Sequence, residues 1–311
     1  MSSSDPIPRG TRRVLVALLV IVVTCGVVSI IVNQTIGEPS ETVRRTKIVD
    51  EPVDALTMDI DRGDITVSPA TNNRVSLTYT IDYTGAEPPV RSNVADGSLT
   101  FWSAGCEDCY VSFDVRVPDQ VALDLRVNGG SVNVGGVDGP SKVTTGWGDI
   151  EVYDTTGAVE AQTGGGSITV HDVTAEVTAT ASPGDVTIED VTGNVDVTSS
   201  EGDIDLFGVT GDLTIESGAG SVFGERLDGR RVGVTSDDDQ VILKFDSPPD
   251  DLTVQAEAGD VELVVPAVES PYLVNATADA EEIDVRIASS PSGRHVITAT
   301  VGDGTLTIRY G

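Results

Sequence analysis

The feature that most constrains this chain is an internal repeat of nine residues that begins at Gly130. Cut at that interval, the sequence reads GSVNVGGVD, GPSKVTTGW, GDIEVYDTT, GAVEAQTGG and GSITVHDVT, and it continues in this form to Gly229. Glycine opens every unit except the one at Ala175. The third and fifth positions are mostly apolar, as in Ile150 and Val152. Such alternation predicts one short strand per unit with one buried face.

Two kinds of unit alternate along the repeat. The eighth position is Val or Leu in one series (Val137, Val173, Val191, Val209, Leu227) and Gly or Ser in the other (Gly146, Gly164, Ser182, Ser200, Gly218), so the true period is eighteen residues. One such coil cannot bury its apolar side chains, whereas stacked coils share a core. The sequence therefore predicts an all-β fold: a single elongated parallel β-solenoid (β-helix) with 18-residue coils, rising about 4.8 Å per coil.

The repeat divides the chain into parts of different regularity. We expect an ectodomain over residues 51–311, with an irregular N-terminal cap and first coils at 51–129, regular coils at 130–235 and looser C-terminal coils and a cap at 236–311. Aromatic residues gather in the early segment: Tyr79, Tyr83, Phe101, Trp102, Tyr110 and Phe113. A bulky cover has a physical reason there, because the open end of a solenoid exposes unpaired strand edges.

The N-terminal segment predicts a membrane anchor. Residues 14–32, VLVALLVIVVTCGVVSIIV, carry no charge, and as a helix they would span roughly 28 Å, about the thickness of the hydrocarbon core of a bilayer. A cleaved signal peptide is the competing interpretation. Arg9, Arg12 and Arg13 precede the span, which favours a cytoplasmic tail at 1–13. Residues 33–50 are polar and are expected to be a linker. The predicted location is the cell membrane, single-pass, with the C-terminal domain extracytoplasmic.

The charge of the chain excludes one class of partner. The net charge is −31, and residues 1–32 hold three Arg and one Asp, so the remainder carries −33. Nucleic acids and anionic lipid surfaces would repel such a domain. The expected partners are instead a cell-envelope polymer, a surface ligand or another membrane protein.

Cysteine adds one expectation. Cys25 lies inside the apolar segment, which leaves Cys106 and Cys109 as a pair in the stretch CEDCY. In an oxidising compartment such a pair most simply forms a small disulfide loop. A zinc site is disfavoured because four ligands are needed and the two histidines, His171 and His295, are far apart.

The most specific polar pattern is a column of aspartates. Asp154, Asp172 and Asp190 are eighteen residues apart, so successive coils would place them one above another. Like charges about 5 Å apart repel, and a hard cation such as Ca²⁺ prefers carboxylate ligands. The other interpretation is that aspartate at a corner accepts hydrogen bonds from turn amides. The calcium-type run Gly-Gly-x-Gly-x-Asp occurs only in fragments, such as TGGGS at 163–167. No other cofactor is expected.

Catalytic constellations are weak. His171 is followed by Asp172, but a nucleophile oriented by both is not indicated, and His295 follows SPSGR in a predicted turn. A polysaccharide-active enzyme would need paired carboxylates in a cleft, for which Asp237, Asp238 and Asp239 are the best candidates. Short turns leave no wall for such a cleft. The expectation is that the protein is not an enzyme.

The recurring units GDITV, GDIEV, GDVTI and GDIDL, the segment CEDCYVSFDVRVPDQVALDL and the terminal GDGTLTIRY give the chain a family resemblance. Over about residues 60–311 it resembles the candidate-adhesin β-strand-repeat family of bacterial and archaeal envelope proteins, a domain of unknown function. The resemblance implies a β-solenoid and a location in the cell envelope. SDDDQ at 236–240 departs from the pattern, because the Gly-Asp start is replaced.

These observations favour a surface adhesion or envelope-scaffold module that performs no catalysis. The alternative is the ectodomain of an envelope-stress sensor that acts through a membrane partner, since a cytoplasmic tail of about thirteen residues cannot signal by itself. The polysaccharide-active enzyme is the third hypothesis.

Overall fold

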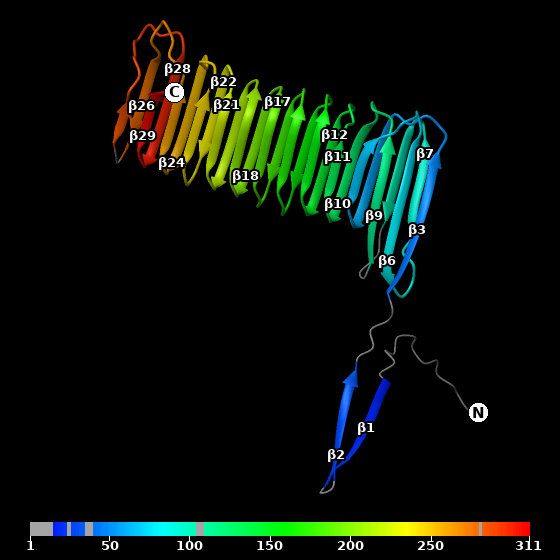
Figure 1. Ribbon diagram of the computed structural model, residues 1–311. Coiled ribbons are helices and arrows are strands. Elements are labelled where there is room, and N and C mark those ends of the chain that lie inside the picture. The colour runs from blue at the N-terminus through cyan, green and yellow to red at the C-terminus, as the bar shows by residue number, and fades with distance from the viewer. Residues whose placement is uncertain (1–14, 24–25, 35–39, 104–108, 280–281) are drawn as a thin grey trace, which may run out of the picture.

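Two long β-sheets face each other and form one elongated stack of coils (Figure 1). The computed structural model describes residues 15–23, 26–34, 40–103, 109–279 and 282–311. The 13-stranded sheet holds, in spatial order, β26 (Leu273–Ala278), β28 (Val296–Asp303), β24 (Asp251–Ala258), β22 (Arg231–Ser236), β20 (Leu213–Ala219), β18 (Val195–Glu201), β16 (Val177–Ala181), β14 (Val159–Thr163), β12 (Ser141–Trp147), β10 (Ala122–Gly129), β4 (Ala55–Arg62), β8 (Ser98–Ser103) and β7 (Val90–Ala95).

The opposite sheet has fourteen strands and runs beside the first along the whole stack. Its order is β27 (Ile283–Val285), β29 (Leu306–Tyr310), β25 (Val261–Val265), β23 (Val241–Phe245), β21 (Val222–Leu227), β19 (Ile204–Thr210), β17 (Val186–Thr192), β15 (Ile168–Val173), β13 (Ile150–Thr155), β11 (Val132–Gly135), β5 (Ile65–Pro69), β9 (Cys109–Val117), β6 (Val75–Thr84) and β3 (Ser40–Val49). Consecutive strands of the regular part alternate between the two sheets, so each coil contributes one strand to each.

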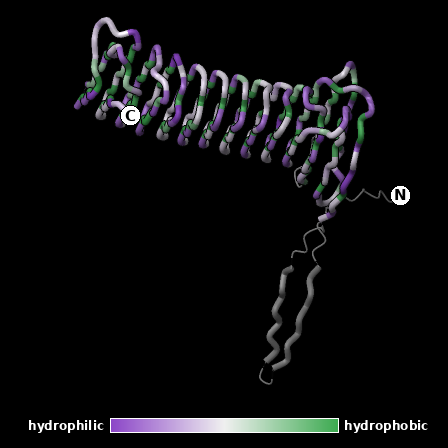
Figure 2. The backbone as a smooth tube through the Cα atoms, turned by 45° about the horizontal axis from the view of Figure 1, so that its top comes forward, coloured by the Kyte–Doolittle hydropathy of each residue, from purple (hydrophilic) through white to green (hydrophobic). Residues whose placement is uncertain are grey.

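The predicted solenoid and its period are confirmed. From β11 to β19, each strand pairs in parallel with the strand eighteen residues on, as in Val132↔Ile150, Ile150↔Ile168 and Ile168↔Val186. All of these side chains are buried. Figure 2 shows the result as regular rungs in which apolar and polar residues alternate. The β-branched residues suit a thin core because their restricted side chains pack well on pleated strands.

The Gly-Asp and Gly-Ser starts of the units have a structural cause. Gly148 has φ +149°, and a Cβ there would lie 2.1 Å from the carbonyl oxygen of Gly130 in the coil before it. No other residue fits this corner. The Asp149 carboxylate accepts a hydrogen bond from the Ser167 amide at 2.9 Å, one coil further on. The same bond recurs at the amides of Ser131, Asp203, Ser221 and Thr305.

A second column of hydrogen bonds lies inside the stack. Thr145 and Thr163 are buried, and the Thr145 hydroxyl donates to the Thr163 hydroxyl at 2.9 Å. The Thr163 hydroxyl donates to the Gly148 carbonyl oxygen at 3.0 Å. Ser199 and Ser217 take the equivalent place further along and bond the turn carbonyls of Gly184 and Gly220. Buried hydroxyls are therefore paired with turn backbone, as burial of polar groups requires.

The N-terminal end differs from the regular coils. Strand β6 pairs antiparallel with β9, and β3 pairs antiparallel with β6. Residues 40–49, which lie within the expected linker 33–50, therefore form an edge strand of the solenoid. Some of the early aromatic residues pack here: Phe101 and Phe113 are buried, and the Phe113 ring lies 5.6 Å from the Tyr79 ring.

The transmembrane helix expected over residues 14–32 is not shown. Within that range the structure describes two strands, β1 (Leu15–Val23) and β2 (Gly26–Gln34), which pair antiparallel. The segment is rich in Val and Ile, which favour strands. In the part of the chain that the structure describes, no helix is long and apolar enough to cross a membrane.

The C-terminal coils are not stacked in sequence order. Strands β26 and β27 form the outermost coil, and β28 and β29, the last in sequence, lie between that coil and β24 and β25. Thus β28 pairs in parallel with both β24 and β26, and β29 with both β25 and β27. After β25 the chain leaves one coil position empty and forms β26 and β27 beyond it. Strands β28 and β29 then occupy the position that was left. The sequence analysis expected looser coils over 236–311 but did not predict this change of order.

The inward register can be tested at two adjacent positions of β17. Val186 is buried, whereas Thr187 is partly exposed on the outer face. Val186→Asn should lower the free energy of unfolding by about 3 kcal/mol or more, because it removes an apolar side chain and buries an amide without partners. Thr187→Asn should cost about 0.5 kcal/mol. Thermal melting followed by circular dichroism measures both, and equal melting temperatures would contradict this register.

Candidate functional site

The period of the repeat breaks in the coil that ends at β22. Val195 pairs with Leu213 eighteen residues on, but Leu213 pairs with Val232 at nineteen and Val232 with Leu252 at twenty. The extra residues fall in the turns that lead into β22 and β24. Because the strands must keep their register, the turns widen outward, and charged residues at the starts of three neighbouring strands come together.

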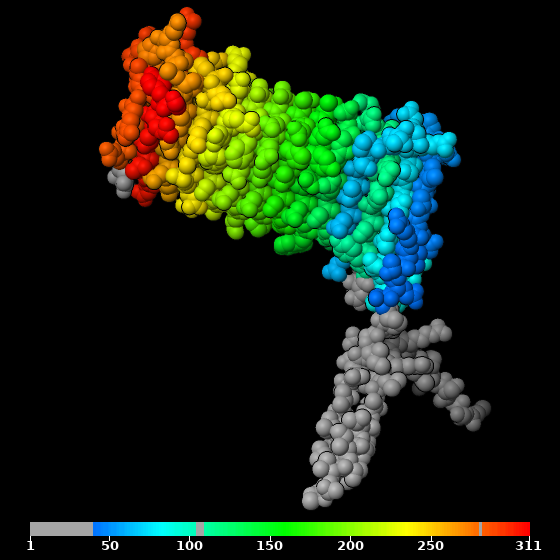
Figure 3. All heavy atoms as spheres, viewed as in Figure 1, coloured from blue at the N-terminus to red at the C-terminus, as the bar shows by residue number. Residues whose placement is uncertain are grey.

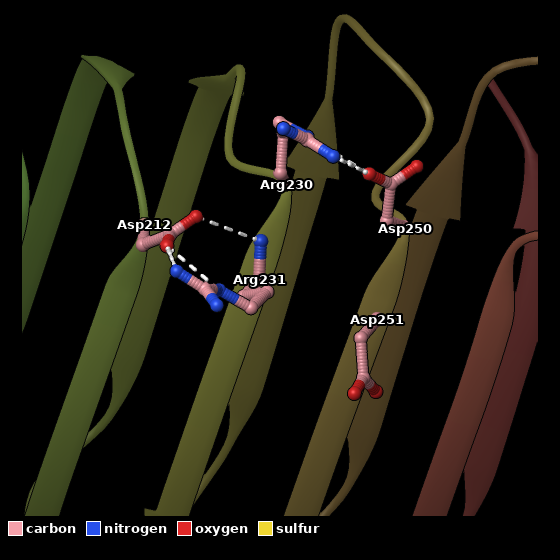
Figure 4. A pocket seen from close by; sticks show the side chains of 5 residues that line it. All are labelled: Asp212, Arg230, Arg231, Asp250 and Asp251. Atoms are coloured by element: carbon pink, nitrogen blue, oxygen red, sulfur yellow. Dashed lines mark hydrogen bonds and ion pairs between the residues drawn. The ribbon is translucent and has the colours of Figure 1, made fainter.

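A shallow pocket of about 300 Å³ lies at this place, open to solvent (Figure 4). Its lining is entirely charged: Asp212, Arg230, Arg231, Asp250 and Asp251. Arg231 Nε donates to Asp212 Oδ2 at 2.8 Å, and the Arg231 amide donates to Asp212 Oδ1 at 3.1 Å. Arg230 Nε donates to Asp250 Oδ2 at 2.8 Å. Two ion pairs from different turns thus form the walls.

The carboxylates of the pocket differ in their charged partners. The hydrogen bonds from Arg231 to Asp212 hold the pKa of that carboxyl below its usual value, and the charges of Arg231 and Arg230 act in the same direction. Asp212 is therefore ionised across the physiological range and is unsuited to act as a general acid. The Asp251 carboxylate has no partner among the described residues. The side chain of Arg230 is 84% exposed, so most of its donors face solvent.

The arrangement offers hydrogen-bond donors and acceptors to a ligand. An open site with free guanidinium donors and a free carboxylate acceptor can hold hydroxyl and charged groups of a polar ligand. His295 lies near the pocket. Its Nδ1 is 3.0 Å from the Pro249 carbonyl oxygen and 3.6 Å from Asp250 Oδ1. The described lining holds no serine, threonine or cysteine.

A second hollow, of about 460 Å³, lies at the opposite corner of the later coils and is more open. It contains Asp239, Asp260 and Asp303. Of the three predicted carboxylates at 237–239, only Asp239 lines it. Asp237 and Asp238 instead make the turn, since their amides donate to the carbonyl oxygens of Ser217 and Gly218. Asp260 accepts hydrogen bonds from the Thr305 hydroxyl and amide, which lower its pKa.

The aspartate column is brought together as predicted, and a backbone constraint accounts for it. Asp154, Asp172 and Asp190 have φ values of 53°, 55° and 49°, and Gly136 and Gly208 hold the same left-handed position in the neighbouring coils. Aspartate and glycine tolerate this conformation better than most residues. The left-handed backbone accounts for aspartate and glycine at this corner, while the expected hydrogen bonds from turn amides and calcium binding both stay predictions. Among described residues, no group of three or more His, Cys, Asp or Glu is arranged to hold a metal.

The aspartates of this column contact different side chains in different coils. Asp172 Oδ2 lies 3.0 Å from His171 Nδ1, and Asp190 Oδ1 accepts a hydrogen bond from Arg226 at 3.1 Å. His171 stacks on Tyr153, with the ring centroids 5.1 Å apart and the planes at 4°. These contacts place His171 in a ladder of side chains on the outer face of the sheet.

Of the two predicted disulfide cysteines, the structure describes one. Cys109 begins β9 and is disulfide-bonded. Cys106 lies outside the described residues, so the pairing Cys106–Cys109 stays a prediction.

The fold defines a class of protein: a parallel β-solenoid, here with a charged pocket on its surface. The sequence matches the family described as Toastrack DUF4097 over residues 53–309, and the chain belongs to this family, whose function is not established. No curated protein matches the chain.

The chain is also similar, at low sequence identity, to several solved structures. A candidate adhesin from Parabacteroides merdae is 14% identical, covering 89% of this chain and 98% of its own, with a TM-score of 0.36. A candidate adhesin from Bacteroides fragilis is 12% identical, covering 87% and 97%, with a TM-score of 0.37. A candidate lipid-binding protein from Parabacteroides distasonis is 12% identical, covering 86% and 96%, with a TM-score of 0.34.

Sequence reasoning missed the arginine pocket, although a signal was present. From residue 130 to residue 225 the chain holds a single lysine or arginine, Lys142, and then Arg226, Arg230 and Arg231 follow within six residues. The same segment carries the first departure from the 18-residue spacing. A cluster of cations at a break in an acidic repeat could have been singled out on these grounds.

The ion pair of the pocket gives a prediction that depends on pH. Arg231→Gln removes the interaction that lowers the pKa of Asp212, so this pKa should rise toward the ordinary value of about 3.9. The stability lost by the variant should be full above that value and should vanish as the pH falls through the lowered pKa of the native carboxyl. Carboxyl-detected NMR titration measures the pKa. Asp260 is the control, because Thr305 lowers its pKa instead, and an equal shift there would contradict the assignment.

The disulfide prediction is checked by mass spectrometry of alkylated, non-reduced protein from native membranes. Cys106 and Cys109 should remain unlabelled and be joined in one peptide, since export removes the reducing conditions that keep thiols free. Two labelled thiols would overturn both the pairing and the exported topology from which it was predicted.

Proposed function

We propose that this protein is a membrane-anchored surface module whose solenoid binds a hydroxylated polymer of the cell envelope without cleaving it. The observation that carries the proposal is the charged pocket, whose open lining includes exposed donors of Arg230 and, further along β24, the free carboxylate of Asp251 (Figure 4). Sugar hydroxyls both donate and accept hydrogen bonds, so a polymer that carries them fits a site with both kinds of group.

The shape of the solenoid supports a binding role rather than an enzymatic one. The coils form a straight column whose visible face is closely filled and lacks a deep cleft (Figure 3). Both hollows lie on the outside of turns, where a long polymer can pass, whereas an enzyme site generally encloses its substrate. The acidic surface keeps nucleic acid away and keeps the domain soluble.

The anchor in this proposal is residues 14–32. Two paired strands leave the outer backbone groups of both strands without partners, and in the hydrocarbon of a bilayer each such group costs several kcal/mol. A helix would pair these groups within the segment, and the uncharged run is long enough to span. The arginines at 9, 12 and 13 favour the orientation with the solenoid outside.

Binding is tested with the full chain in detergent and purified envelope polysaccharide on beads. Arg230→Ala combined with Asp251→Ala should reduce retention by about tenfold or more, since each lost hydrogen bond contributes about 1 kcal/mol. Lys142→Ala is the matched control, because Lys142 is an exposed cation of the regular coils that pairs with Glu160. Equal retention of both variants and the wild type would refute the pocket as the binding site, and capture of a membrane protein in place of polymer would favour the sensor hypothesis.

Topology is tested separately by adding protease to intact cells. The solenoid should be digested from outside while residues 1–13 remain protected, because the positive flank holds the tail in the cytoplasm. A solenoid that is protected in intact cells, or released entirely into the medium, would overturn the anchor.

A further inference from the structure

The two ends of the solenoid present different edges. Any stack of parallel coils leaves an unpaired strand at each end of each sheet, and such edges recruit other chains unless they are protected. At the N-terminal end these strands are β3 and β7, and at the C-terminal end they are β27 and β26.

The β3 edge of the N-terminal end is protected by inward-facing charge, whereas β7 has Val90, Ser92 and Val94 at its inward positions. Lys47 and Arg45 pair with Leu77 and Tyr79 of β6, so they face the core side of the sheet. Arg45 forms an ion pair with Glu87 at 2.6 Å, and the Lys47 amine lies 5.4 Å from the centre of the Phe101 ring. Charged side chains at inward positions of an edge strand oppose the addition of another strand, because addition would bury them.

The C-terminal end has no such protection at the corresponding positions. Ile283 and Val285 of β27 pair with the buried Leu306 and Ile308, so they also face the core side, yet they are 40% and 36% exposed. In β26 the inward positions are Val274, Ala276 and Ala278, which pair with the buried Ile297, Ala299 and Val301. The last coil therefore leaves an apolar layer uncovered between two free strand edges.

The backbone groups at this end are aligned for strand addition. The Leu306 amide donates to the Glu282 carbonyl oxygen, and the Arg286 amide donates to the Ile308 carbonyl oxygen. Since alternate residues of a strand direct their N–H and C=O groups to opposite sides, Ile283 and Val285 direct theirs to the free edge. In β26 the bonds of the Leu273 and Asp279 amides to β28 leave Val274, Ala276 and Ala278 in the same situation.

We propose that two copies of this chain join tail to tail, with β27 antiparallel to β27 and β26 antiparallel to β26 of the second copy. The two-fold axis passes through Val285. This register is chosen by charge: it places Asp284 opposite Arg286 of the other copy, twice. A centre at Asp284 would set two aspartates opposite each other, and a centre at Ile283 would set Glu282 opposite Asp284. Like charges directly opposite in a sheet are destabilising.

The same two-fold axis also pairs β26, the edge strand of the other sheet, with its copy. Ala276 lies two residues before the end of β26 and Val285 two residues after the start of β27, so an axis through Val285 meets β26 at Ala276. Antiparallel pairing there sets Ala276 opposite itself and Val274 opposite Ala278, all of them small and apolar. The exposed apolar layers of the two copies then close one continuous core. A head-to-tail stack would instead place Arg45 and Lys47 over Ile283 and Val285, and closed two-fold dimers are the common solution among homo-oligomers.

A cysteine on the axis tests this geometry. In Val285→Cys the new thiol lies opposite its own symmetry mate, with Cα atoms about 5.5 Å apart, a distance that a disulfide spans. Mild oxidation of the full chain in detergent should give a covalent dimer on a non-reducing gel. The wild type reports the background from Cys25, Cys106 and Cys109, and Lys47→Cys on β3, which faces the core side as Val285 does, is the control at the other end. A cross-link that forms only when the Val285→Cys and Lys47→Cys chains are mixed would show head-to-tail stacking and overturn the proposal.

Charge exchange tests the register without cysteine. Asp284→Arg and Arg286→Asp each place like charges opposite one another twice, so each should weaken dimerisation by about tenfold or more in sedimentation of the full chain. The double variant restores opposite charges at both places and should dimerise like the wild type, with unchanged composition. Single variants that remain dimeric, or a double variant that stays monomeric while its circular dichroism is native, would refute this interface. The inference rests on the described solenoid alone and holds whether or not residues 14–32 are an anchor.

Discussion

The whole structure depends on the contact between one coil and the next. Parallel pairing at a fixed offset of eighteen residues stacks Ile150, Ile168 and Val186 into one core column. The same offset brings the corner glycines so close that a Cβ at Gly148 would collide with the Gly130 carbonyl oxygen. Each unit is held by its neighbours rather than by its own interior, which is the general condition of a solenoid. The repeated glycine and the repeated valine are therefore two consequences of a single spacing.

Specific polar contacts keep the coils in register where the apolar core alone would permit sliding. The Asp149 carboxylate binds the Ser167 amide of the next coil, and buried hydroxyls such as that of Thr163 bind the turn carbonyls. A slip of one residue would lose all of these bonds and would turn the buried face outward. The acidity of the chain has a partial explanation here, because several of its aspartates are acceptors in this ladder.

The features that distinguish this chain arise where the stacking rule is broken. One extra residue before β22 and two before β24 push Arg230, Arg231 and Asp250 out of the regular turns and create the charged pocket. At the C-terminus, insertion of β28 and β29 behind β26 and β27 leaves an apolar coil outermost. At the N-terminus, by contrast, antiparallel strands and inward charges close the stack. The two ends of the solenoid therefore differ from each other, and one side carries a charged pocket that the regular coils lack.

The sequence by itself determined the fold class, the 18-residue coil, the inward positions and the alignment of Asp154, Asp172 and Asp190, because periodicity and strand alternation are local properties that a core must satisfy. It also indicated the aromatic cap. Only the tertiary structure decided that residues 40–49 join the sheet, that the last coil lies inside the one before it, and that Arg231 meets Asp212. These outcomes depend on which strand edge is free when a segment docks, and parallel edges of similar pattern are equivalent until the rest of the stack is in place.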